Sequence, residues 1–391
     1  MDAARRVIDN GAVAVRGDKI IAVGPAAEIA AQHPARQRVD RPNALLIPGL
    51  INTHCHGPMV LLRGIADDLN LQDWLKKYIF PAEGKLVSPE FVRQGTRLAA
   101  WEMIRGGITA YADMYYFEEV IAEETKRAGM RGLLGQTIIK FPVADAKTPE
   151  IAMQRADAFM AKYKNDPLIV ATVAPHAPYT NSDAMLQACR LLADKYGVPV
   201  VTHLSETARE NEDSRQEFKT SPTKRLENIG FFNGPTLVAH AVWLDEADID
   251  ILARRKVGVA HNPGSNTKLA SGIAPVVRML DKGIAVGVGT DGPAGSNNDL
   301  NLFEEMDLAA KLQKVTLRDP RALNAEQAFA MATILGARAM SMESKIGSLE
   351  AGKLADLVVL SQDPFKIDPL RLHETKVLTT VFNGRVVYDV R

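Results

Sequence analysis

The fold of this chain is decided by residues 45–56, which read Leu45-Leu46-Ile47-Pro48-Gly49-Leu50-Ile51-Asn52-Thr53-His54-Cys55-His56. An apolar run that ends in polar residues is typical of a buried strand. Side chains two residues apart share a face of a strand, so His54 and His56 point one way and Cys55 the other. The two imidazoles predict half of a site for a divalent metal such as zinc. A His-x-His pair is weak evidence by itself, and its weight depends on what recurs along the chain.

The same unit, an apolar run followed by a break and a helical pattern, returns along the chain. Eight runs are predicted to be strands: residues 45–56, 108–114, 131–139, 168–176, 198–206, 236–244, 256–262 and 284–291. Helical spacing lies between them, for example at 89–105, 117–129, 148–164, 182–196 and 301–314. Strands alternating with helices indicate parallel strands, and eight is the number that closes a (β/α)8 TIM barrel. An open doubly wound sheet is the alternative, but no glycine-rich phosphate turn follows the first run.

The two flanks predict a second, smaller unit. Residues 7–23 have the pattern of a hairpin that turns at Gly17-Asp18, and residues 377–387 turn at Asn383-Gly384. We expect strands from both chain ends to meet in one small sheet. The predicted organisation is an α/β fold, with a β-sandwich domain of residues 1–44 and 349–391 beside a metal-dependent barrel domain of residues 45–348.

Composition indicates an ordinary globular protein. The chain has 391 residues, of which 46% are hydrophobic and 24% charged, and Lys+Arg and Asp+Glu both number 47. This balance favours neither a nucleic-acid nor a membrane-surface partner. Two cysteines, Cys55 and Cys189, argue against a disulfide framework and for a cytoplasmic location. We find no apolar run of about 18 residues, as a membrane span needs, and no signal-peptide pattern.

Histidines gather at the ends of the predicted strands. Six of the eight lie there: His54, His56, His176, His203, His240 and His261. The active sites of barrels are built at the carboxyl ends of the strands, so this distribution is the strongest functional signal in the sequence.

Four of the strand-end residues form a metal-ligand set. His203 ends the fifth run and Asp291 the eighth, and with His54 and His56 they supply three nitrogens and one carboxylate. A catalytic zinc takes such ligands and keeps a position open for water, which becomes a nucleophile near neutral pH. Each residue has a plainer alternative, a buried histidine bonded to a carbonyl for His203 and a helix N-cap for Asp291. Together they favour one divalent metal ion, with zinc first and iron(II) or manganese(II) as alternatives.

Three further residues are predicted to act beside the metal. Glu206 follows His203 by three residues and could shuttle protons to a leaving group, or it could be an acidic residue favoured at a helix start. His240 could orient the attacking water or polarise the substrate, with a buried structural histidine as the alternative. His176 is predicted to contact the substrate, because the metal already has four ligands.

In this order the motifs resemble those of the amidohydrolase superfamily, in the branch of 5-methylthioadenosine/S-adenosylhomocysteine deaminases and related chlorohydrolases. The resemblance covers nearly the whole chain and rests on residues 48–56, 62–69, 80–83, 202–207, 261–266, 289–292 and 352–359. It implies that His54, His56, His203 and Asp291 hold one zinc ion. It also implies that Glu206 protonates the ring of an aminopurine while His240 and Asp291 help to deprotonate the attacking water, so that ammonia leaves.

The resemblance also implies a substrate pocket. Glu83 matches a position that hydrogen-bonds ribose hydroxyls, and His176 matches a contact near the purine or sugar. Trp74 is a further candidate for the lining, with a packed core aromatic as the alternative. Gln136 occupies the position where relatives that handle S-adenosylhomocysteine can carry an arginine, and Lys140 or Lys147 could replace that charge.

The implied reaction converts methylthioadenosine, adenosine or S-adenosylhomocysteine to the inosine-type product plus ammonia. The nearest alternative is hydrolysis of a triazine, pterin or guanine-type ring on the same scaffold. An inactive relative that serves as an assembly module is a third hypothesis, and the intact ligand set argues against it. Homo-oligomerisation stays open. Relatives usually begin with one more strand, so we expect the small sheet to be short by one.

Overall fold

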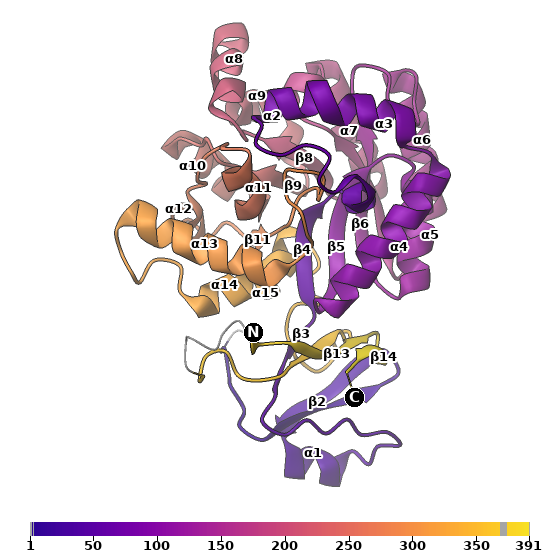
Figure 1. The fold of residues 1–391 in the computed structure, drawn as a ribbon, viewed down its shortest axis with the longest axis vertical. Coiled ribbons are helices and arrows are strands. Elements are labelled where there is room, and N and C mark those ends of the chain that lie inside the picture. Colours follow the sequence, from indigo (N-terminus) through magenta and orange to yellow (C-terminus); the bar gives the residue numbers. More distant parts are fainter. Residues whose placement is uncertain (1, 3, 368–373, 391) are drawn as a thin grey trace.

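The computed structural model describes residues 2, 4–367 and 374–390. Two four-stranded parallel sheets occupy the centre of the larger body (Figure 1), in the orders β4-β5-β6-β7 and β11-β10-β9-β8. Their strands are β4 (Leu50–Cys55), β5 (Ile108–Tyr115), β6 (Arg131–Ile138), β7 (Ile169–Pro175), β8 (Val200–Leu204), β9 (Thr236–His240), β10 (Gly258–His261) and β11 (Val286–Val288). The prediction of an α/β fold with parallel strands is confirmed.

Backbone hydrogen bonds link the two sheets at both of their outer edges. Between β7 and β8, the His203 N–H donates to the carbonyl of His176 at 3.0 Å. Beyond β4 and β11, the Asp291 N–H donates to the carbonyl of His54 at 2.9 Å, and Cys55 pairs with Asp291 in an isolated parallel bridge. The strand ends that carry the predicted site residues are therefore bonded to one another.

Helices follow most of the strands and bury their apolar faces on them. The longer ones are α4 (Pro89–Arg105), α5 (Glu118–Ala128), α6 (Pro149–Lys162), α7 (Asp183–Tyr196), α8 (Ala208–Phe218), α10 (Glu246–Arg255) and α13 (Leu302–Leu317). Short ones are α9 (Pro222–Asn228), α11 (Pro263–Lys268), α12 (Val276–Asp281), α14 (Ala325–Met331), α15 (Ile334–Ala339), η3 (Pro178–Thr180) and η4 (Phe231–Asn233). Ser88, Thr148 and Ser182 cap α4, α6 and α7 with their side chains, which explains where these predicted helices begin.

A helical segment lies between β4 and α4. It consists of η1 (Gly57–Leu62), α2 (Leu71–Asp73), the π-helix η2 (Trp74–Ile79) and α3 (Phe80–Leu86). π-Helical turns are rare and occur frequently at functional sites. Within the described part of the chain, no helix has the length and apolar character that crossing a membrane would require.

Strands from both chain ends lie side by side outside the larger body (Figure 1). β1 (Gly11–Arg16) and β2 (Lys19–Pro25) form the predicted hairpin, as do β13 (Val377–Phe382) and β14 (Arg385–Asp389). These ends contribute to two sheets, whereas one was predicted: β1-β2 is separate from the sheet β14-β13-β12-β3, which contains β12 (Leu357–Leu360) and β3 (Leu45–Pro48). The Lys19–Leu354 bridge and a small core around Ile20 join the two sheets. α1 (Ala26–Gln32) follows β2.

The prediction of a single strand over residues 45–56 is wrong. β3 pairs antiparallel with β12, whereas β4 pairs parallel with β5. The break falls at Gly49, where a Cβ would lie 2.1 Å from Thr109 Oγ1. Only glycine allows this close approach, and the chain changes sheets there.

Candidate metal centre

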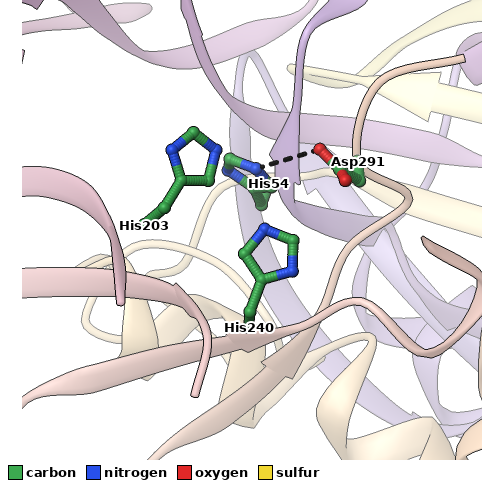
Figure 2. A group of neighbouring side chains, drawn as sticks. All are labelled: His54, His203, His240 and Asp291. Atoms are coloured by element: carbon green, nitrogen blue, oxygen red, sulfur yellow. Dashed lines mark ion pairs between the residues drawn. The ribbon is translucent and has the colours of Figure 1, made fainter. Parts of the chain in front are cut away.

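Four buried side chains converge at the carboxyl ends of the parallel strands. They come from His54 on β4, His203 on β8, His240 on β9 and Asp291 after β11, and one ligand atom of each lies within 4.8 Å of the others (Figure 2). His56 adjoins this group, because its Nε2 lies 3.2 Å from Asp291 Oδ1, next to His54 Nε2 at 3.3 Å. The structure thus brings three of the four predicted ligands into one group together with His240, whereas the fourth, His56, lies beside the group in contact with Asp291.

Hydrogen bonds fix which ring nitrogen of two histidines faces inward. His56 Nδ1 lies 2.6 Å from the carbonyl of Met114, and His203 Nδ1 lies 2.6 Å from the carbonyl of His176. A carbonyl only accepts, so each Nδ1 carries a hydrogen, and in the neutral ring Nε2 keeps its lone pair for a metal. Although burial lowers it, the contact with Asp291 raises the pKa of His56 to about 9, so a metal at His56 Nε2 would replace a proton. The two sequence hypotheses for His203, a carbonyl-bonded histidine and a ligand, are compatible because they use different nitrogens.

The electrostatics of the group suit a cation. Burial alone would raise the pKa of Asp291, but His54 and His56 hold it well below its ordinary value. Burial lowers the pKa of His54 to about 4, so this ring is neutral at pH 7. Ser265 Oγ donates to Asp291 Oδ2 at 2.6 Å, which leaves Oδ1 facing the histidines.

His54 provides the test of fit for a metal. Neither of its ring nitrogens has a hydrogen-bond partner among the described residues, although Nε2 faces the Asp291 carboxylate. A buried polar atom without a partner costs about 1–3 kcal/mol. A cation at Nε2 would remove that cost and would also neutralise the buried carboxylate, so the donor set fits one divalent metal ion.

Two of these residues have backbone conformations that are unusual for side chains with a Cβ. His240 has a φ of 74° and Asp291 a φ of 59°. Left-handed conformations of non-glycine residues cost about 1–3 kcal/mol each and concentrate at functional sites. Here they occur where each chain segment leaves its strand, and they direct both side chains to the centre.

An acid and a base lie beside the metal ligands. Glu206 is 4% exposed, and its Oε2 lies 3.8 Å from His240 Nε2. Burial raises the pKa of Glu206, which favours its protonated form. His240 Nδ1 donates to Asn266 Oδ1 at 2.9 Å, so Nε2 is left as an acceptor. The pair can therefore give and take protons from a bound molecule.

A small cavity of about 50 Å³ opens beside this group. Its polar end is lined by His56, His176, His203, Glu206, His240 and Asp291. Its other walls are largely apolar, with the aromatic residues Trp74, Phe80, Tyr115, Tyr116 and Tyr179. Aromatic walls beside a few convergent polar groups are typical of a site for a small ring compound.

Three predicted substrate contacts line the cavity. Glu83 is buried, accepts a long hydrogen bond from the Tyr116 hydroxyl at 3.5 Å, and has a pKa that burial raises to about 7. Burial lowers the pKa of His176 to about 3, so its ring is neutral. Trp74 lies in the π-helix and donates from Nε1 to the carbonyl of Ala294 at 3.0 Å.

The prediction for Gln136 is not supported by its position. Gln136 is fully buried on β6, its Nε2 donates to Asp145 at 2.9 Å, and it does not line the cavity. The next residue, Thr137, does line it, because neighbouring side chains of a strand point to opposite faces. Sequence reasoning also missed Tyr115 and Tyr116, although their place at the end of a predicted strand was a signal.

Parallel strands that bring histidines, an aspartate and an acid–base pair to their carboxyl ends define a metal-dependent α/β enzyme. The chain belongs to the amidohydrolase family, whose model matches residues 45–387. Residues 11–35 match a second model, that of an imidazolonepropionase-like composite domain of bacteria.

Similar proteins include named deaminases. The chain is 47% identical to the 5-methylthioadenosine/S-adenosylhomocysteine deaminase of Syntrophobacter fumaroxidans, across 100% of this chain and 91% of that protein. It is 46% identical to the enzyme of the same name from Thermodesulfovibrio yellowstonii, across 91% and 81%. Among solved structures, an adenosine deaminase from Xanthomonas campestris with bound zinc has a TM-score of 0.94 at 40% identity, covering 98% of this chain and 89% of that one. Its zinc agrees with the fit of one Zn²⁺ to the buried group described above.

Proposed function

We propose that this protein is a zinc-dependent aminohydrolase that releases the amine of an aminopurine nucleoside as ammonia. The observation that carries the proposal is the position of Glu206 and His240, 3.8 Å apart in the cavity wall beside the metal ligands. The substrates are methylthioadenosine, adenosine or S-adenosylhomocysteine, and each product is of the inosine type. The deaminases named among the relatives support this substrate class.

His54, His56, His203 and Asp291 would hold the ion. When bound, zinc acidifies water toward neutral pH and so supplies the nucleophile. The Nδ1 of His240 is bonded to Asn266, so His240 accepts the proton of the water at Nε2, and Asp291 assists. Glu206, protonated through burial, donates its proton to the ring nitrogen next to the carbon under attack. The water oxygen adds to that carbon, and the proton that His240 took from the water passes to the amine. The carbon–nitrogen bond then breaks, ammonia leaves, and the proton still on the oxygen returns to Glu206 as the carbonyl forms.

The other walls would select the nucleoside. A Glu83 carboxylate can accept hydrogen bonds from two ribose hydroxyls, and a buried site of this kind rejects analogues that lack them. The neutral His176 ring and the aromatic side chains offer faces on which a purine can stack.

The proposal extends to the fold. The backbone bonds at both outer edges support one closed (β/α)8 barrel made of the two sheets. The strands of residues 1–44 and 349–391 would form a β-sandwich domain beside the barrel domain of 45–348, with the first boundary moved to Gly49 by the pairing of β3. Two free, buried cysteines support a cytoplasmic location, and the equal numbers of acidic and basic residues support a protein without a nucleic-acid partner.

The alternative is hydrolysis of a triazine, pterin or guanine-type ring. The chain shares its fold with the zinc complex of the atrazine chlorohydrolase from Arthrobacter aurescens, at a TM-score of 0.90 and 24% identity across 99% and 92% of the two chains. That likeness shows the fold alone. The buried Glu83 favours the nucleoside, because a free ring has no pair of hydroxyls to donate to it.

The test is ammonia release by the zinc-loaded protein from nucleosides, free purine bases, a pterin and a triazine. We expect turnover of the nucleosides and its loss in His54→Ala, while the matched variant His33→Ala in the flank keeps full activity. Turnover of a triazine, a pterin or guanine without turnover of nucleosides would replace the proposal with the alternative. Full activity of His54→Ala would overturn it.

A further inference from the structure

Glu210 lies in the first turn of α8, four residues after Glu206. Thr207-Ala208-Arg209-Glu210 has the sequence of a capping box, in which the glutamate bonds back to the N–H of the N-cap residue. Thr207 does cap α8, because its hydroxyl accepts from the Glu210 N–H at 3.2 Å. The carboxylate of Glu210 reaches past the N-cap instead and accepts from the N–H groups of Ser205 at 3.0 Å and of Glu206 at 2.8 Å.

Both oxygens of the Glu210 carboxylate bond to the turn that carries Glu206, the proposed acid. Glu210 is 7% exposed, so it is almost as buried as a core residue. Its two oxygens each take one of two successive backbone N–H groups, an arrangement in which neighbouring amides bind an anion. Ser205 has a φ of 49°, which is costly for a residue with a Cβ and needs support from its surroundings.

The same turn is bonded to the segment that follows His240. The carbonyl of Ser205 accepts from the N–H groups of Val242 at 3.1 Å and Trp243 at 2.9 Å, and the carbonyl of Leu204 accepts from Ala241 at 3.0 Å. The backbone on either side of the 3.8 Å pair of Glu206 and His240 is therefore one hydrogen-bonded unit, and Glu210 closes it from the side of α8.

We propose that Glu210 is a positioning residue for the deamination: its carboxylate fixes the 205–206 turn and so sets the distance and direction of Glu206 relative to His240 and the substrate. This inference rests on the proposed function, in which Glu206 is the acid. Misplacement by about 1 Å can cost about 100-fold in rate, so a helix residue with no substrate contact can control turnover.

The kinetic test uses Glu210→Ala and Glu210→Gln in the zinc-loaded full chain. We expect kcat for adenosine or methylthioadenosine to fall by about 10- to 100-fold in Glu210→Ala, with KM within about threefold. Glu210→Gln keeps the shape and one acceptor oxygen, so its kcat should be intermediate. Glu212→Ala, an exposed glutamate of the same helix, is the matched control and should match the wild type.

A double variant distinguishes a positioning role of Glu210 from a general loss of stability. In Glu206→Gln, the further change Glu210→Ala should lower kcat by less than about threefold, because both changes act on one step. The proposal would be overturned if the losses of kcat in the two single variants multiplied in the double variant. It would also be overturned if Glu210→Ala kept the same kcat as Glu212→Ala. A wild type that deaminates no nucleoside would instead refute the proposed function, whereas hydrogen exchange of the Ser205 and Glu206 amides would still report on the turn.

Hydrogen exchange provides a readout that does not depend on turnover. The amides of Ser205 and Glu206 should exchange at least about tenfold faster in Glu210→Ala than in the wild type, with and without zinc, and Glu212→Ala should leave them unchanged. Ser88→Ala, which removes the N-cap of α4, shows what a distant loss of stability does to the same amides. Equal exchange in Glu210→Ala and the wild type would contradict the proposed role.

Discussion

Replacing Glu83 with glutamine tests how the cavity recognises a nucleoside. Glu83 is 6% exposed and accepts a long hydrogen bond from the Tyr116 hydroxyl at 3.5 Å, so its two oxygens keep acceptor lone pairs for a ligand. Glutamine keeps the shape but loses the charge and one of the two acceptor oxygens. The expected effect is a loss of nucleoside recognition without loss of the metal or of the acid–base pair.

The magnitude follows from the kind of bond lost. A hydrogen bond to a charged group contributes about 1.5–3 kcal/mol, so Glu83→Gln should lower kcat/KM for adenosine by about 10- to 150-fold. For 2′,3′-dideoxyadenosine, which lacks both hydroxyls, wild type and variant should differ by less than about threefold. The four values of kcat/KM, for two proteins and two nucleosides, form a double-change cycle that isolates the contact between Glu83 and the ribose hydroxyls.

The pH dependence adds a second signature. Burial raises the pKa of Glu83 to about 7, so the anionic acceptor forms as the pH rises through 7. The ratio of kcat/KM for adenosine to that for dideoxyadenosine should therefore climb through pH 7 and level off above it, and in Glu83→Gln it should be flat. Initial rates of ammonia release from pH 5.5 to 8.5 provide both data sets. An equal loss for both nucleosides, or the same pH-dependent ratio in both proteins, would refute the ribose contact.

Three further predictions concern charge, stability and the metal. First, no lysine or arginine of the described residues lines the cavity, so the amino-acid carboxylate of S-adenosylhomocysteine would be buried there without a partner. The kcat/KM for S-adenosylhomocysteine should therefore be at least about tenfold below that for methylthioadenosine, and equal values would contradict this. Second, the folded protein binds the Glu83 proton more tightly than the unfolded chain (pKa about 7 against 4.5), so stability falls as the pH rises between these values. At pH 8 the free energy of unfolding of Glu83→Gln should exceed that of the wild type by at most about 3 kcal/mol, seen as a higher Tm, and at pH 4 the two should not differ. Third, Ser265→Ala should weaken zinc binding by about 10- to 100-fold in chelator competition, because Ser265 orients Asp291, while Ser88→Ala leaves the affinity unchanged.

The parallel strands and helix starts could be predicted because local patterns determine them. Apolar runs mark buried strands, and capping side chains such as Ser88 and Ser182 mark where helices begin. The change of sheet at Gly49 could not be predicted in this way, since the apolar run continues across it. The reason for the break is the close approach of Thr109, which comes from a strand about sixty residues later in the chain.

The metal ligands could also be predicted, because each one ends a strand and strand ends meet in space. The residues that orient them could not. Ser265 and Asn266 bond to Asp291 and His240 across more than twenty residues of sequence, and no local pattern connects them. Gln136 is buried away from the cavity while Thr137 lines it, because neighbouring side chains of a strand point to opposite faces and a motif does not fix which face is inside. Glu210 departs from its capping-box pattern because the neighbouring turn offers two amides in place of one.

Zinc K-edge X-ray absorption on the purified protein, with the metal content of the same sample, tests directly whether three imidazoles and one aspartate hold a single cation. We expect one zinc per chain, three imidazole nitrogens and one or two oxygens at about 2.0–2.2 Å, and no sulfur in spite of the nearby Cys55. A protein without stoichiometric metal, a zinc–sulfur distance of about 2.3 Å, or fewer than three imidazoles would contradict the account.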